Sequence, residues 1–156
     1  MSLEARIRKL EAADEIRRLK AHYCDLCDDG YDARVLAGLF TTDAVWDGGS
    51  LGRFETREAI RRFFERMPRV LSFAIHHLTN PVVEVSDDGE NAKGRWYLLR
   101  TATVIAGNRA VWIAGRYDDE FRREDGEWRF QRIALRTRFF TPFESGWAEV
   151  PFLDVG

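Results

Sequence analysis

Two adjacent histidines, His76 and His77, are the side chains in this sequence best suited to acid–base chemistry. The chain has three histidines, and imidazole titrates near neutral pH, which suits a base that takes a proton from carbon. Because the two are consecutive on an expected strand, they face opposite sides of the sheet, and at most one can enter a shared pocket. A hydrogen-bonded core or rim histidine is the alternative for each. His22, on the expected first helix, is predicted to be solvated.

Three acidic residues, Asp25, Asp28 and Asp29, stand near the end of that helix. The helix dipole disfavours negative charge there. Asp25 lies opposite the apolar stripe, where solvation explains it, whereas Asp28 lies on the flank and the helical wheel leaves its orientation open. The cluster lacks the alternating oxygen-ligand spacing of a calcium loop, so we predict no metal site.

Three arginines, Arg132, Arg136 and Arg138, follow one another on the last expected strand, in the same alternation as Trp128 and Phe130. A buried arginine needs an anionic partner or a substrate oxygen. Alternation alone does not say which of the three is buried, and a salt bridge at the rim is the alternative for each.

The pair Cys24 and Cys27 has the spacing of a redox motif, but it falls late in a helix, where the dipole disfavours a thiolate. The chain contains no further cysteine with which to build a zinc site. We predict two buried thiols without a chemical role.

The sequence predicts a single domain over residues 1–156, with helices before strands. Apolar spacing predicts a helix over residues 3–29, a short one capped by Asp32 and a third capped by Thr56. Short strands are expected at 44–46 and 52–54. Hairpin turns then separate four long strands, at about 71–86, 91–106, 109–123 and 127–140. This order indicates an α+β fold built on an antiparallel meander.

The composition excludes several classes of partner. Lys and Arg number 24 against 26 Asp and Glu, for a net charge of −2, which argues against nucleic-acid binding. No apolar run is long enough to span a membrane, and residues 1–15 lack the apolar stretch of a secretory signal. We therefore expect a cytoplasmic protein.

Apolar residues on both faces of the second long strand predict a homo-oligomer, a dimer or a trimer. One face carries Trp96, Leu98, Ala102 and Val104, and the other carries Tyr97, Leu99, Thr101 and Ile105. A sheet with one wet face alternates more cleanly. Residues 140–156 are also apolar, and we expect this tail to cover the pocket mouth or pack on a neighbouring subunit.

Five segments and a closing stretch together resemble the SnoaL-like branch of the nuclear-transport-factor-2-like superfamily. The resemblance extends from about Ile16 to Phe143. It rests on the segments at 23–28, 39–46, 75–80, 94–98 and 125–130, and on the closing stretch at 136–142. It implies a cone-shaped α+β barrel, in which N-terminal helices pack on a strongly curved, mostly antiparallel sheet around a pocket.

The resemblance also implies a catalytic set. Asp28 and His76 match the Asp–His dyad of the family's lyases, and Arg136 matches the arginine that completes the set. Tyr23 matches a tyrosine, five residues before the aspartate, that a dehydratase of the family carries and a dehydrochlorinase of the family lacks. The residues expected to line the apolar pocket are Trp46, Phe73, Trp96, Leu98, Ile113 and Tyr117.

The expected function is a cofactor-independent lyase, such as a dehydratase, or an isomerase that uses the same base on a small hydrophobic cyclic substrate. No metal or organic cofactor is required. Two alternatives remain: a non-catalytic binding protein, and a structural subunit resembling the small subunit of aromatic-ring dioxygenases.

Overall fold

The computed structural model describes residues 1–154. Three helices come early in the chain, and the long strands follow. The elements are α1 (Leu3–Asp28), α2 (Ala33–Gly38), β1 (Phe40–Asp47), η1 (Gly49–Leu51), β2 (Arg53–Glu55), α3 (Arg57–Arg66), η2 (Met67–Arg69), β3 (Leu71–Val85), β4 (Asn91–Val104), β5 (Arg109–Glu124) and β6 (Glu127–Pro142). The predicted order of helices and strands is confirmed.

Local side-chain chemistry sets where the helices begin and end. Asp32 accepts hydrogen bonds from the backbone at the start of α2, and Thr56 does the same for α3. After α1, Gly30 adopts a φ of 98° that a residue with a Cβ rarely reaches. Within α2, Leu36 is buried, whereas its neighbour Val35 is exposed.

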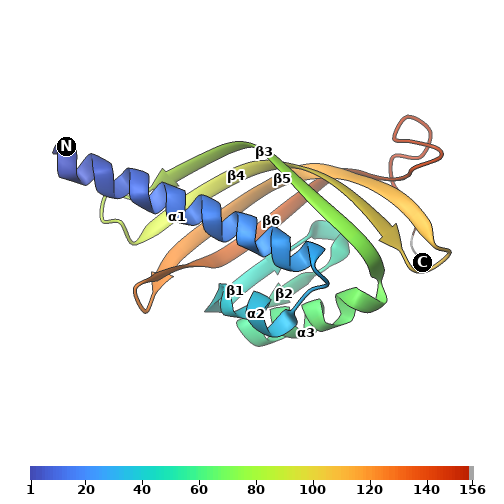
Figure 1. The fold of residues 1–156 in the computed structure, drawn as a ribbon, viewed down its shortest axis with the longest axis horizontal. Helices are drawn as coiled ribbons and strands as arrows, with labels where there is room; N and C mark the ends of the chain where they lie inside the picture. The colour runs from blue at the N-terminus through green and yellow to red at the C-terminus, as the bar shows by residue number, and fades with distance from the viewer. Residues whose placement is uncertain (155–156) are drawn as a thin grey trace.

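Within residues 1–154 the strands form one six-stranded sheet in the order β2-β1-β6-β5-β4-β3. All neighbours are antiparallel except β1 and β6. Figure 1 shows α1 crossing the long strands on one face, with α2 and α3 beside β1 and β2 at one end. The α+β class and the mostly antiparallel curved sheet are as predicted.

Bulges in β3, at the edge of the sheet, and in β6, in its interior, bend the sheet and change which side chains face inward. On β3, Ser72 is an extra residue between the pairs that Leu71 and Phe73 make with β4. On β6, Gln131 and Arg138 are extra residues opposite β5. Each bulge increases the local bend and reverses the alternation of side chains beyond it.

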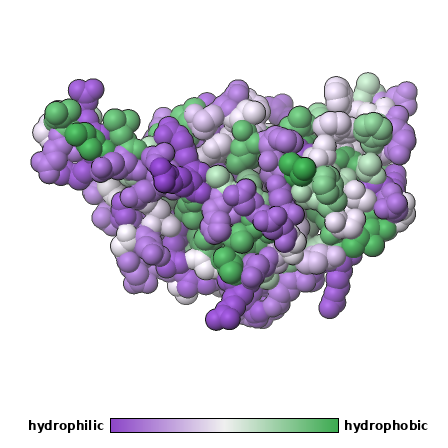
Figure 2. Space-filling model, in the orientation of Figure 1, coloured by the Kyte–Doolittle hydropathy of each residue, from purple (hydrophilic) through white to green (hydrophobic). Residues whose placement is uncertain are grey.

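The core lies between the helices and the inner face of the sheet, and aromatic rings fill much of it. Phe40, Phe64, Phe121 and Phe130 are almost fully buried there. The first turns of α1 extend beyond the sheet, and Figure 2 shows apolar groups at this free end. Leu3 and Leu10 are exposed in this part of the helix.

The outer face of β3 and β4 is also apolar in part. Phe73, Tyr97 and Leu99 are each between 41% and 49% exposed. Among residues 1–154, no helix has the length and apolar character needed to span a membrane.

Candidate active site

A cavity of about 470 Å³ opens between the helices and the inner face of the sheet. Its wall is mainly aromatic and aliphatic, with one imidazole and several guanidinium groups. The lining residues are Tyr23, Cys27, Tyr31, Trp46, Leu51, Phe54, Phe63, Arg66, Met67, Arg69, Val70, Leu71, His76, Arg100, Val104, Ala106, Tyr117, Leu135 and Phe140. An apolar pocket with a few polar groups is typical of a small-molecule site.

Asp28 and His76 meet at the edge of this cavity. Asp28 ends α1, and its Oδ1 lies 2.5 Å from Nδ1 of His76 on β3. The backbone N–H of His76 donates to the other oxygen, Oδ2, at 2.9 Å. The Ser72 bulge turns Ala74 and His76 toward the helices, whereas Phe73 and His77 are exposed. Both carboxylate oxygens of Asp28 are therefore committed to one residue of β3.

This geometry selects one form of the imidazole. A carboxylate only accepts hydrogen bonds, so Nδ1 carries the proton and Nε2 is the unprotonated nitrogen, which acts as an acceptor. Burial lowers the pKa of His76, the hydrogen bond that its ring donates to Asp28 raises it, and the positive charge of Arg100 lowers it. The net lowering leaves the ring neutral at pH 7, which is the state that a general base requires.

Arg100 on β4 is the arginine that lies beside His76. Its Nη1 is 3.4 Å from Nε2 of His76, and the residue is 9% exposed. Sequence reasoning overlooked it, although a signal was present: Arg100 follows the same alternation as Trp96, Leu98 and Ala102, which all face the core. A charged residue in phase with an apolar face is the pattern that could have identified it.

Arg136 is not brought to the cavity. Because Gln131 is a bulge, the alternation that begins with Phe130 reverses, and Ile133 and Leu135 point inward in place of the arginines. Arg136 is exposed. Arg132 lies on the same side and forms an ion pair with Asp47 at 3.2 Å.

Tyr23 on α1 lines the cavity and contacts another predicted residue. Nε1 of Trp46 donates a hydrogen bond to its hydroxyl oxygen at 3.1 Å. The phenol proton of Tyr23 remains available to donate, and the sulfur of Cys27 lies within its reach. Burial raises the pKa of Tyr23, so the hydroxyl stays protonated.

The predicted lining residues divide into two groups. Trp46 and Tyr117 line the cavity. Trp96, Leu98 and Ile113 are buried but belong to the core around it, and Phe73 is 49% exposed on the outer face. The Ser72 bulge explains Phe73, while Trp96 packs edge-on against Phe121.

A buried ion pair beneath the cavity was also missed. Nζ of Lys20 lies 2.7 Å from Oδ2 of Asp119, and both side chains are at most 1% exposed. The ammonium group sits 3.4 Å from the ring centroid of Tyr117, a cation–π contact with a cavity-lining residue. Lys20 follows Ile16 by one helical turn, so its place on the apolar stripe was the available signal.

The two cysteines are free and buried, as predicted. Burial raises the pKa of Cys24 to about 12 and also raises the pKa of Cys27. Among residues 1–154, no three His, Cys, Asp or Glu side chains are grouped so that they could hold a metal ion.

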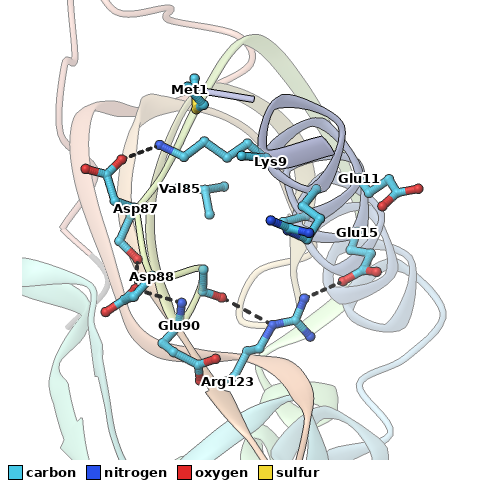
Figure 3. Close-up of a pocket in the computed structure, with 14 residues that line it drawn as sticks. Met1, Lys9, Glu11, Glu15, Val85, Asp87, Asp88, Glu90 and Arg123 are labelled. Atoms are coloured by element: carbon cyan, nitrogen blue, oxygen red, sulfur yellow. Dashed lines mark hydrogen bonds and ion pairs between the residues drawn. The ribbon is translucent and has the colours of Figure 1, made fainter. Parts of the chain in front are cut away.

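A second hollow, of about 520 Å³, lies near the N-terminus between α1 and the β3–β4 turn. Figure 3 shows Lys9 reaching Asp87 and Arg123 reaching Glu15 across it. Each of these cations is paired with a carboxylate, and the two carboxylates are exposed to solvent. We therefore assign the chemistry to the cavity beside His76.

Helices that close one face of a curved sheet around a pocket define the class of nuclear-transport-factor-2-like proteins. One such protein with a cystatin-like fold, from Novosphingobium aromaticivorans, superposes with a TM-score of 0.66 at 27% identity, covering 94% of this chain and 92% of that one. The chain belongs to the SnoaL-like family, because the model of the SnoaL-like domain matches residues 8–134.

Dehydrochlorinases are among the relatives. The gamma-hexachlorocyclohexane dehydrochlorinase of Sphingobium indicum is 32% identical over 109 residues, which cover 69% of each chain. The crystal structure of LinA superposes with a TM-score of 0.81 at 25% identity, covering 89% of this chain and 94% of that one.

Proposed function

We propose that this protein is a cofactor-independent lyase that removes water or a hydrogen halide from a small cyclic substrate. The observation that carries the proposal is the 2.5 Å contact between Asp28 and Nδ1 of His76, which leaves Nε2 unprotonated beside an apolar cavity. The similarity to a dehydrochlorinase supports the same reaction class.

Three side chains take part in the proposed elimination. Nε2 of His76 takes a proton from a ring carbon, and the electron pair of that C–H bond forms the new double bond as the leaving group departs. Asp28 holds the ring orientation and stabilises the imidazolium that forms. Tyr23 is a neutral phenol, and its oxygen already accepts a hydrogen bond from Trp46. It donates its proton or a hydrogen bond to the departing oxygen or halide.

An isomerase would use the same base and return the proton to another carbon. A binding protein would need no hydrogen bond between Asp28 and His76, so the close contact favours catalysis. We also propose that the chain assembles as a homo-oligomer, because Phe73, Tyr97 and Leu99 leave an apolar outer face on β3 and β4.

The test is turnover of a panel of hydroxylated and halogenated cyclic compounds, with loss of water or hydrogen halide followed by mass spectrometry. We expect His76→Ala and Asp28→Asn to lower the rate by about 10²–10⁴-fold, the usual contribution of a general base. His77→Ala is the matched control, because this neighbouring histidine is exposed. Wild-type rates in His76→Ala would refute the proposed base.

A further inference from the structure

Arg100 carries a buried positive charge without an acidic partner. In the part of the chain that the structure describes, His76 is the polar side chain at hydrogen-bond distance from the guanidinium of Arg100. The Nε atom of Arg100 has no hydrogen-bond partner there. Asp28, bonded to the opposite nitrogen of the His76 ring, has both oxygens committed to His76. Burial of an arginine normally requires an anion.

The rest of the cavity wall reinforces this charge. Arg66 and Arg69 also line the cavity and are exposed at its opening, whereas no Asp or Glu is among the described residues that line it. Several guanidinium groups and no carboxylate create a positive potential in a site whose walls are otherwise apolar. Such a potential attracts anions and disfavours cations.

Tyr31 supplies a second unsatisfied donor to the same cavity. Its hydroxyl is buried without a hydrogen-bond partner, and the charge of Arg100 acts on it, opposing the rise in its pKa that burial causes. The backbone of Tyr31 is held at a φ of 60°, which is strained for an aromatic residue. The turn after α1 therefore places this ring in the cavity wall at a conformational cost.

We infer that Arg100, with Tyr31, is the receptor for an anionic oxygen group of the substrate, and that the substrate is an apolar cyclic carboxylate. The inference takes the cavity of the proposed function as the substrate site. A carboxylate accepts hydrogen bonds from a guanidinium and a phenol in the geometry that each donor prefers. Since Nη1 of Arg100 lies 3.4 Å from Nε2 of His76, a carboxylate held there brings the adjoining ring to the base.

The probes are 2-naphthoate and 2-naphthamide, which share a flat two-ring body and differ in charge. Isothermal titration calorimetry at low ionic strength measures the ratio of their dissociation constants. We expect the wild type to bind the carboxylate about 10- to 100-fold more tightly, the range of a charge-assisted hydrogen bond. Equal binding of the two probes, or binding of neither at millimolar concentration, would overturn the inference.

Arg100→Met keeps the side-chain stem and removes the charge, so we expect it to abolish the preference while the amide still binds. Arg138→Met, at an exposed arginine of β6, is the matched control and keeps the wild-type ratio. If Arg100→Met does not fold, Arg100→Lys and Tyr31→Phe decide by the same ratio, and an unchanged ratio in both contradicts the inference. This experiment measures binding alone. Wild-type turnover in His76→Ala would therefore refute the proposed role of His76 as the base, but it would not change the measured preference for the carboxylate.

Discussion

Replacing Lys20 with Met breaks the buried ion pair beneath the cavity and leaves the carboxylate of Asp119 without its partner. The two groups are 2.7 Å apart, and neither side chain is more than 1% exposed. Oδ1 of Asp119 has no hydrogen-bond partner, so apart from Lys20 the carboxyl is influenced mainly by the backbone of Ala134. Met fits the space of the lysine stem and isolates the loss of charge.

The expected loss of stability is large. Removing one partner of a buried ion pair costs about 3–5 kcal/mol, because the remaining charge stays desolvated. For a chain of 156 residues, the entropy of unfolding is about 0.33 kcal/mol/K, so this loss lowers Tm by about 9–15 °C.

The loss also depends on pH. Burial raises the pKa of Asp119 to about 6, and Lys20 opposes that rise. Without Lys20 the pKa in the folded state is higher still, whereas in the unfolded chain it stays near 3.8. A carboxyl whose pKa is raised by folding favours the folded state at low pH and loses that contribution as the pH rises. The deficit of Lys20→Met is therefore larger at pH 8 than at pH 5.

Urea denaturation followed by circular dichroism at pH 5, 6, 7 and 8 measures this deficit against the wild type at each pH. The control is Lys20→Met combined with Asp119→Asn, which removes the isolated charge and should recover stability at pH 8 with little dependence on pH. A Lys20→Met variant as stable as the wild type at pH 8, or equally destabilised at every pH, would refute the reasoning.

Three further predictions concern the site and the surface. Asp28→Asn removes a hydrogen bond and a charge that raise the pKa of His76, so NMR titration of the imidazole should give a lower pKa than in the wild type; a higher one contradicts the assigned contact. Arg136→Met should leave turnover unchanged, because the side chain is exposed; a lost activity would return this arginine to the site. Leu99→Glu, on the apolar outer face, should shift size-exclusion elution to that of a monomer, and an unchanged oligomer would place the interface elsewhere.

The elements were predictable because their signals are local. Asp32 and Thr56 cap helices through hydrogen bonds within their own turns, and the turn at Asp88–Gly89 carries its conformational preference in two residues. The α+β class followed from the order of these elements. The dyad was reached through family resemblance, since the helical wheel left Asp28 undecided.

The orientation of side chains on the long strands was not predictable in the same way. Gln131 and Ser72 are unremarkable in sequence, yet each bulge reverses the faces beyond it. Bulges depend on how neighbouring strands meet: a Cβ on Gly115 of β5 would lie 2.6 Å from the carbonyl oxygen of Arg136 on β6. That close approach, next to the bulge at Arg138, involves residues distant in sequence. The resemblance suggested Arg136 for the pocket, whereas the structure places Arg100 there and leaves Arg136 exposed.

The placement of Asp28 in the last turn of α1 makes its contact with His76 depend on how that helix packs against β3. Both oxygens of Asp28 bond to His76 across 48 residues of chain, so an opening that moved this turn away from β3 would break both bonds together. Lys20 joins the same helix to Asp119 on β5. We therefore expect this ion pair to help hold Asp28 beside His76 from a point about two turns earlier in the helix.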